Sequence, residues 1–229
     1  MHGAIFDLDG TLADTAGDLL AAANAVLEPA GLPLLDPQAD RPYAGRGGRE
    51  MIRRSLTIAG RHPMQDAEVA LTDSLYQPLL EAYSGALSVQ TRLYDGVIDC
   101  LDQLESEGWK IGVCTNKPEH LALRLLDDLE IRHRFGAILG ADTLPVRKPD
   151  PVHFTETATR IGADPSVSVM IGDTLTDLST ARNAGVPCVL TTFGFAAEPL
   201  DELAPDAIVG HYDEIPGVLA GFHRPSASA

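Results

Sequence analysis

The chain has 229 residues, of which 45% are hydrophobic and 22% are charged, as in an ordinary globular protein with one large domain or two unequal ones. Its formal net charge of −16 argues against a nucleic-acid-binding protein, which needs a basic face. Its apolar runs fall far short of the roughly 20 residues that cross a membrane, and its N-terminus lacks a signal-peptide pattern. We therefore expect a cytoplasmic protein that binds neither nucleic acid nor a membrane.

Strand-like apolar runs alternate with amphipathic helical stretches along most of the chain. The runs predict strands at residues 4–6, 110–114, 137–140, 168–171, 186–190 and 207–209. The amphipathic stretches predict helices at residues 96–107, 118–129, 151–161 and 175–184. Such alternation indicates parallel strands joined by right-handed crossovers, and the continuous apolar strands indicate a sheet covered on both faces. We predict an α/β fold with a Rossmann-like parallel sheet.

One segment interrupts this alternation. Residues 15–85 show helical periodicity at 18–27, 49–58 and 66–83, with little strand signal and several punctuating prolines and glycines. We predict a helical domain over residues 15–85, inserted into an α/β core formed by residues 1–14 and 86–229. The last residues, 223–229, are small and polar and are predicted to fray.

The three cysteines lie far apart among apolar residues, at Cys100, Cys114 and Cys188. A disulfide framework or a zinc site would need more cysteines at closer spacing. We expect all three to be buried, reduced thiols.

The segment richest in chemistry is the string DLDGTL at residues 7–12, directly after the first predicted strand. Ligands of open parallel sheets bind beyond the carboxyl ends of the strands, where this string falls. Asp7 and Asp9 would crowd together, which raises the pKa of one carboxyl group unless a cation such as Mg2+ intervenes. The other carboxyl group could shuttle protons, and Thr11 offers an anion its hydroxyl and amide groups. The alternative is an ordinary turn rich in Asp and Gly.

Polar residues follow later strands as well. Thr115 and Asn116 stand between a predicted strand and a helix that opens near Pro118, where they could bind phosphate or merely cap the helix. Lys148 lies before another helix, in a loop stiffened by two prolines. Its ammonium could neutralise phosphate oxygens or a nucleophile, and the alternative is an exposed loop lysine.

Asp173 follows the strand predicted at residues 168–171, and Asp177 lies near the start of the next helix. They would supply the carboxylates that a hard divalent ion needs. The alternative, an N-cap with a favourable dipole contact, explains one aspartate better than two. We expect the residues at these successive strand ends to meet in one cation-binding site.

These motifs resemble the haloacid dehalogenase superfamily, in its phosphatase branch, over nearly the whole chain. The string at residues 7–11 resembles its first motif, Thr115-Asn116 its second, Lys148 its third, and the segment from Gly172 to Asp177 its fourth. The helical insertion resembles the cap domain of the family. The strings VCTNKP at 113–118, RKPDP at 147–151 and YAGRGG at 43–48 are most similar to phosphoglycolate phosphatases.

The resemblance implies a phosphatase in which Asp7 attacks phosphorus and forms an aspartyl-phosphate. Asp9 would protonate the leaving group and then activate water. A Mg2+ cofactor would be held by Asp7, the backbone carbonyl of Asp9, and Asp173, with Asp177 as a further ligand or an orienting residue.

The resemblance also implies that Thr11, Thr115 and Asn116 bind the phosphoryl group, and it gives Lys148 a catalytic role in stabilising the charge of that group. The substrate would be a small-molecule phosphate ester, expected to be 2-phosphoglycolate, and the protein a monomer or homodimer. Arg46, or its neighbour Arg49, could pair with a substrate carboxylate; the alternative is a solvated surface arginine. The loop GRGG at residues 45–48 departs from the Gly-small/polar-Gly pattern expected of phosphoglycolate phosphatases.

Other interpretations stay open at this point. A sugar-phosphate mutase or a pyrophosphatase of the same fold would use similar residues. A haloacid dehalogenase needs no metal, and Asp9 argues against it. A non-catalytic phosphate-sensing or partner-binding protein could share the fold, because fold does not fix function.

Overall fold

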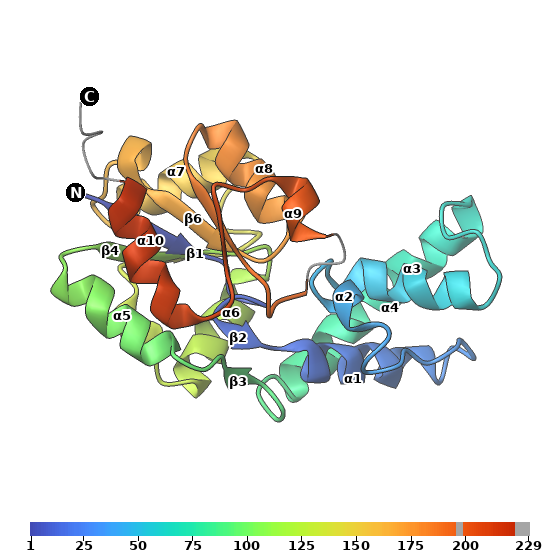
Figure 1. Cartoon of the computed structure of the whole chain (residues 1–229). Helices are drawn as coiled ribbons and strands as arrows, with labels where there is room; N and C mark the ends of the chain where they lie inside the picture. The colour runs from blue at the N-terminus through green and yellow to red at the C-terminus, as the bar shows by residue number, and fades with distance from the viewer. Residues whose placement is uncertain (196–198, 223–229) are drawn as a thin grey trace. The chain divides into compact units, whose positions relative to one another are not determined.

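The computed structural model describes residues 1–195 and 199–222 (Figure 1). The chain divides into two compact units, one combining Met1–Ala13 with Leu93–Ala229 and the other formed by Asp14–Arg92. The fraying predicted for residues 223–229 lies outside the described residues. Within the described part, no helix is long and apolar enough to cross a membrane.

The larger unit is built on a six-stranded sheet in the order β5-β4-β1-β6-β7-β8. Its strands are β1 (Gly3–Phe6), β4 (Lys110–Cys114), β5 (Ala137–Leu139), β6 (Val169–Gly172), β7 (Cys188–Thr191) and β8 (Ala207–Val209). Every neighbouring pair is parallel. The predicted α/β fold with a Rossmann-like sheet is confirmed, with some strand ends shifted by one or two residues.

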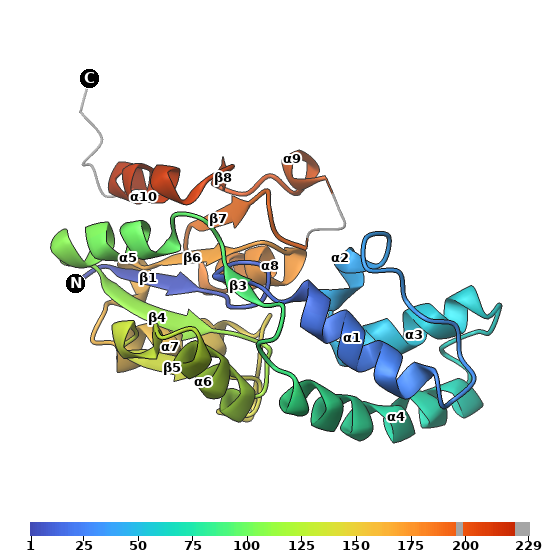
Figure 2. The ribbon, with the colours of Figure 1, turned by 90° about the horizontal axis from the view of Figure 1, so that it is seen from below.

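Helices cover both faces of this sheet. They are α5 (Val97–Ser106), α6 (Glu119–Asp128), α7 (Pro151–Arg160), α8 (Leu175–Ala184), α9 (Leu200–Leu203) and α10 (Ile215–Phe222), with the 3-10 helices η1 (Arg132–Arg134), η2 (Pro165–Val167) and η3 (Tyr212–Glu214). The chain moves outward through α6 and then returns across β1 through α7, so right-handed crossovers place these two helices on opposite faces. α7 packs against α8 (Figure 1), and α5 packs against α10 (Figure 2).

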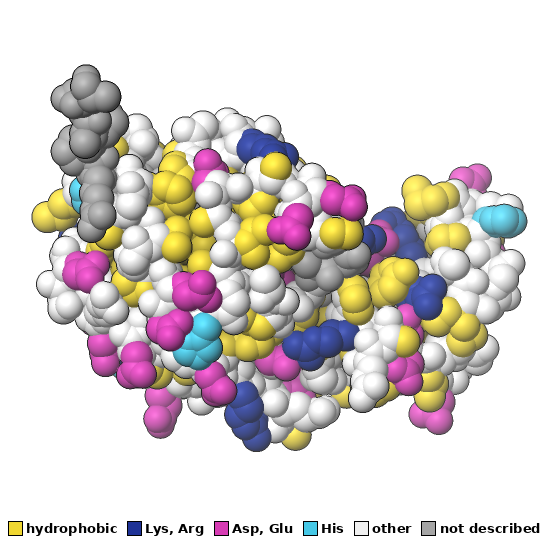
Figure 3. All heavy atoms as spheres, in the orientation of Figure 1, with side chains coloured by type: hydrophobic (Ala, Val, Ile, Leu, Met, Phe, Trp, Pro, Cys, Tyr) yellow, Lys and Arg dark blue, Asp and Glu magenta, His cyan; other side chains and the backbone are white. Residues whose placement is uncertain are grey.

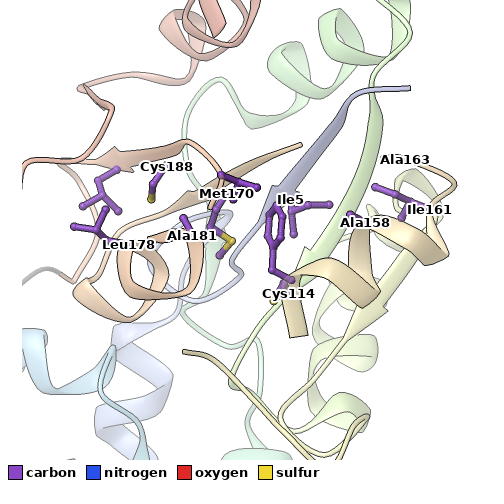
Figure 4. Packing of buried hydrophobic residues seen from close by; sticks show 12 residues of the cluster. Ile5, Cys114, Ala158, Ile161, Ala163, Met170, Leu178, Ala181 and Cys188 are labelled. Atoms are coloured by element: carbon purple, nitrogen blue, oxygen red, sulfur yellow. The ribbon is translucent and has the colours of Figure 1, made fainter. Parts of the chain in front are cut away.

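The core between the sheet and the pair α7 and α8 is apolar and closely packed (Figure 4). Ile5 of β1 and Met170 of β6 belong to one buried cluster with Ala158 of α7 and Leu178 of α8. This burial explains why the strands are apolar at every position rather than at alternate ones.

The cysteines contribute to this packing and not to covalent links. Cys114 and Cys188 belong to the same cluster, Cys100 is buried on α5, and all three are free, as predicted. Burial raises the pKa of Cys100 and of Cys114 to about 12, so these thiols stay protonated at neutral pH.

The smaller unit is helical, as predicted for the insertion. Its helices are α1 (Ala16–Leu27), α2 (Arg41–Ala44), α3 (Gly48–Ile58) and α4 (Asp66–Gly85). α1 packs along α4, and α3 packs against both. Leu20, Leu27, Ile52 and Leu79 are almost fully buried, which gives these amphipathic helices a shared core of their own.

The chain passes between the units at two short paired strands, β2 (Ala13–Asp14) and β3 (Arg92–Leu93). Close to them, the buried Asp18 carboxylate accepts hydrogen bonds from the Gln90 N–H at 3.0 Å, the Thr91 N–H at 2.9 Å and the Thr91 hydroxyl at 2.8 Å. Asp18 therefore ties the start of α1 to the segment that leaves the helical unit.

Candidate active site

The carboxyl ends of three adjacent strands carry residues that the sequence analysis singled out. β1 lies between β4 and β6, so that Phe6 is beside Val113 and Ile171. The first residues after these strands are Asp7, Thr115 and Asp173, and all three are buried. Residues far apart in the sequence therefore come together at one edge of the sheet.

Lys148 is a central cation of this group. Its Nζ lies 3.0 Å from Asp7 Oδ1 and 2.7 Å from Asp177 Oδ1, and its side chain is only 1% exposed. The alternative of an exposed loop lysine is therefore wrong. Burial opposes the charge, but Asp177 and Asp7 outweigh this effect and hold the pKa of Lys148 above its ordinary value. Lys148 is therefore charged at neutral pH.

The positive charge around Asp7 is too small to keep the pKa of its carboxyl group at the ordinary value. Burial raises its pKa to about 6 against the attraction of Lys148, and repulsion from Asp177 and Asp9 adds to the rise. Its Oδ1 also accepts the Leu8 N–H at 2.7 Å. A divalent cation is the kind of group that would stabilise the ionised form of this carboxyl group.

Asp177 forms hydrogen bonds both to Lys148 and to the residues at the start of α8. Its Oδ1 accepts from Lys148, and its Oδ2 accepts from the Asp173 N–H at 3.2 Å, the Thr174 N–H at 3.1 Å and the Thr174 hydroxyl at 2.8 Å. Thr174 and Asp177 form a capping box, so the helix-capping interpretation holds for Asp177. Gly172 permits this approach, because a Cβ there would lie 2.3 Å from Asp177 Cγ.

Asp173 is fully buried, and both of its oxygens accept hydrogen bonds. The Thr11 hydroxyl donates to Oδ1 at 3.0 Å, and the Phe195 N–H donates to Oδ2 at 2.6 Å. Burial, with repulsion from Asp177 and Asp7, raises the pKa of Asp173 well above its usual value. Thr11 thus contacts an acidic residue, and its own carbonyl accepts the buried Tyr212 hydroxyl at 2.6 Å.

Two glycines bring the backbone against the Asp173 carboxylate. A Cβ on Gly10 would lie 2.3 Å from Asp173 Oδ2, and a Cβ on Gly194 would lie 2.4 Å from it. Gly194 and Phe195 belong to the loop after β7, which the sequence analysis did not connect with the site. This loop orients the Asp173 carboxylate.

We expect Gly194→Ala to weaken divalent-metal binding about 10-fold, because the added methyl group displaces Asp173 and loss of such orienting contacts typically has this effect. Calorimetric titration with Mn2+ measures the affinity directly. Gly217→Ala is the matched control, since a Cβ at Gly217 would meet no heavy atom within 4 Å apart from its chain neighbours and the adjoining backbone of α10. Equal Mn2+ affinity in the two variants would contradict the role given to the loop.

The interpretation of Thr115 and Asn116 as helix caps is wrong. The N-cap of α6 is Pro118, and the Glu119 N–H donates to Asp142 Oδ1 at 2.7 Å. The two residues are therefore available for other contacts.

Thr115 and Asn116 have different surroundings. Thr115 Oγ1 accepts the Lys117 N–H at 3.1 Å, which leaves the hydroxyl proton to be donated to another acceptor. Asn116 Nδ2 donates to the Lys148 carbonyl at 3.0 Å and so supports the loop that carries Lys148.

Asp9 has a partner that the sequence analysis did not identify. Lys117 Nζ lies 2.8 Å from Asp9 Oδ1, and the Lys117 side chain is 2% exposed. The close cluster of carboxylates consists of Asp7, Asp173 and Asp177, whereas Asp9, near enough to repel Asp7, is paired with an ammonium group of its own. The available signal was a lysine just before a helix N-terminus, where the helix dipole disfavours a cation that has no other partner.

The acidic cluster fits a divalent metal ion. One carboxylate oxygen from each of Asp7, Asp173 and Asp177 lies within 4.8 Å of the other two. With Asp9 included, four carboxylates face the two ammonium groups of Lys117 and Lys148, so a single divalent cation would balance the ionised site. Because acidic side chains are also spread over the face shown in Figure 3, an anionic ligand would need such local positive charge.

His153 on α7 is a further buried residue beside Lys148. Its Nδ1 accepts the Lys148 N–H at 3.2 Å, which places the proton of the neutral ring on Nε2. Burial, together with the charge of Lys148, lowers the pKa of His153 to about 4. His153 is therefore neutral in the working protein.

We expect His153 to contribute to acid destabilisation. The unfolded chain protonates it near pH 6.5 and the folded protein only near pH 4, so the unfolded state binds more protons between these values. The free energy of unfolding therefore falls as the pH drops, by about 2 kcal/mol between pH 7 and pH 4.5. His153→Asn keeps an acceptor but does not titrate. In urea unfolding, the difference in free energy of unfolding between wild type and His153→Asn should therefore shrink by about 2 kcal/mol between pH 7 and pH 4.5. A difference that stays constant over this range would contradict the assignment.

The two arginines considered for a substrate carboxylate lie in the helical unit. Arg49 forms an ion pair with Asp73 and lies over the Tyr76 ring, 4.2 Å from its centroid. Arg46 is exposed, with its guanidinium 5.8 Å from the centroid of Tyr43. Arg49 is thus engaged within the helical unit, and the pairing of Arg46 with a substrate carboxylate stays a prediction.

A parallel sheet interrupted after its first strand by a helical insertion, with an acidic cluster at the ends of its central strands, is the arrangement that the motifs predicted for a hydrolase of the haloacid dehalogenase type. Residues 4–191 match the model of the haloacid dehalogenase-like hydrolases, and the chain belongs to this family. The family resemblance indicated by the motifs is therefore confirmed.

Several similar proteins are named for one activity. The chain is 39% identical over 216 residues to a phosphoglycolate phosphatase of Mesorhizobium japonicum, covering 94% of this chain and 93% of the relative. It is 40% identical over 211 residues to a phosphoglycolate phosphatase of Caulobacter vibrioides, covering 92% and 87%. A crystal structure from Haemophilus somnus, described as a predicted phosphoglycolate phosphatase, matches with a TM-score of 0.83 at 27% identity, covering 94% of this chain and 96% of that one.

Proposed function

We propose that the protein is a Mg2+-dependent phosphomonoester hydrolase in which Asp7 attacks phosphorus and forms an aspartyl-phosphate. The observation that carries this proposal is the position of Asp7, a buried carboxylate at the end of central strand β1 with the Lys148 ammonium 3.0 Å away. A carboxylate needs no activating base once nearby positive charge keeps it ionised.

Asp9 is the proposed proton carrier. Its side chain is 17% exposed, against 13% for Asp7 and none for Asp177, so it is the most solvent-exposed of these three carboxylates. Asp9 gives a proton to the ester oxygen as the P–O bond breaks. It then takes a proton from the water that attacks the aspartyl-phosphate, which releases phosphate, restores the Asp7 carboxylate and returns Asp9 to its protonated form.

The remaining residues hold the transferring group. The Thr115 hydroxyl and Lys148 donate to phosphoryl oxygens, while Asp177 orients Lys148. Asp7, Asp173 and the backbone carbonyl of Asp9 would hold the Mg2+ ion. The bound ion would reduce the repulsion between the Asp7 carboxylate and the phosphate dianion.

The proposed substrate is 2-phosphoglycolate. Its support is the name shared by relatives that are 39% and 40% identical over most of both chains. The helical unit is proposed to act as a cap, with Arg46 as a partner for the substrate carboxylate.

A phosphate-release assay over a panel of phosphate compounds tests the proposal. The panel contains 2-phosphoglycolate, β-glucose 1-phosphate and pyrophosphate, each with Mg2+ and with EDTA. We expect the highest kcat/KM for 2-phosphoglycolate, loss of activity in EDTA and recovery with Mg2+. Isomerised sugar phosphate without free phosphate would indicate a mutase instead. Absence of phosphate release from every compound would refute an enzymatic role.

A further inference from the structure

Lys117 lies in the site without a role in the steps above. Its Nζ is 2.8 Å from Asp9 Oδ1, and its side chain is 2% exposed. Removing an ammonium group from water is costly unless a counter-charge and hydrogen bonds compensate. Asp9 supplies that counter-charge, so each member of the pair fixes the other.

The backbone of Lys117 is held on both sides. Its N–H donates to Thr115 Oγ1 at 3.1 Å, and its carbonyl accepts the Ala141 N–H at 2.9 Å. Gly140 leaves room for this segment, because a Cβ there would lie 2.7 Å from the Lys117 carbonyl oxygen. The ammonium group therefore reaches Asp9 from a backbone segment that hydrogen bonds hold in place.

Asp9 itself lies in a turn and not in a strand. Gly10, which follows it, has a φ of +80°, and β1 ends at Phe6. Within the described residues, the Asp9 side chain accepts a hydrogen bond at Oδ1 from Lys117 Nζ. Lys117 therefore determines how this carboxylate is turned, with Oδ1 held and Oδ2 left for another partner.

We propose that Lys117 is a positioning residue for proton transfer, holding Asp9 so that Oδ2 faces the ester oxygen of the leaving group. The inference rests on the proposed role of Asp9 as the acid of the reaction. Lys117 is distinct from Lys148, which contacts Asp7 and Asp177 and stabilises the phosphoryl group.

A residue that serves proton transfer matters only when the leaving oxygen needs a proton. We expect Lys117→Met to lower kcat/KM about 30-fold for 2-phosphoglycolate, an alkyl ester, and less than about threefold for p-nitrophenyl phosphate, whose leaving group departs unprotonated. Lys117→Arg should recover part of the activity on the alkyl ester. Equal losses on both esters, or no loss on either, would overturn the proposal. If Lys117→Met does not fold, the activities of Lys117→Arg and wild type on the two esters still test the proposal.

Two controls separate this inference from the proposed function. Lys110→Met makes the same chemical change at the amino end of β4, away from the strand ends of the site, and should leave both esters unaffected. Asp9→Asn should show the same dependence on the leaving group, and the double variant should lose no more than Asp9→Asn alone. If Asp9→Asn lacks this dependence, the proposed acid is wrong. If only Lys117→Met lacks it, the inference about Lys117 alone is wrong.

Discussion

Asp7→Asn is expected to lower kcat for phosphate release by about 10⁴-fold or more, because an amide oxygen cannot form the aspartyl-phosphate. The fold should be retained. Burial already disfavours ionised Asp7, whose pKa is raised to about 6, so a neutral side chain of the same shape is tolerated there. We expect the free energy of unfolding to change by no more than about 1 kcal/mol.

Two measurements check this expectation. Phosphate release gives kcat, and acid quenching after mixing with phosphate-labelled substrate shows whether label stays on the protein. Wild type should retain label and Asp7→Asn should not. Asp99→Asn, an exposed aspartate on α5, is the matched control and should behave as wild type. Turnover by Asp7→Asn above about a tenth of the wild-type rate would show that another group is the nucleophile.

Lys148→Met is expected to lower both activity and stability. The substitution leaves Asp177, whose side chain is 0% exposed, and Asp7 facing each other without the ammonium between them. Removing one partner of a buried ion pair costs about 3 kcal/mol or more, and we expect a loss of this size in urea unfolding at neutral pH.

Further variants identify the cause of that loss. Adding Asp177→Asn to Lys148→Met should restore part of the stability, since it removes one of the unpaired buried charges. Lys110→Met, at the amino end of β4, should change stability little. Unchanged stability in Lys148→Met would mean that the ion pairs do not determine the packing around Asp177.

The central part of the fold could be predicted because its physical signals are strong. Strands covered on both faces read as continuous apolar runs, and the bounds of β4, β8 and α8 agree with the prediction. β2 and β3 have two residues each, too few to show a period. α10 was not predicted because its sequence IPGVLAGF is apolar on nearly every side and contains Pro216 and two glycines.

The candidate site could be predicted as a set of residues but not as a set of contacts. The rule for strand ends identified Asp7, Thr115 and Asp173 because each follows a strand. The contact of the Phe195 N–H with Asp173 comes from a backbone amide, whose presence no residue type reveals. The pairing of Lys117 with Asp9 joins residues 108 positions apart, and sequence alone does not give the geometry of a turn well enough to predict it.

The central place of β1 has a consequence for how the protein is made. β1 is translated before the helical unit, but its neighbours β4 and β6 are translated only after the whole of that unit. That unit is continuous from Asp14 to Arg92 and has its own core, so we expect it to fold first, as domains do during synthesis. Asp173 and the Phe195 amide arrive later still. While residues 93–195 are being translated, the nascent chain therefore carries Asp7 without the full set of residues that surround it in the folded site.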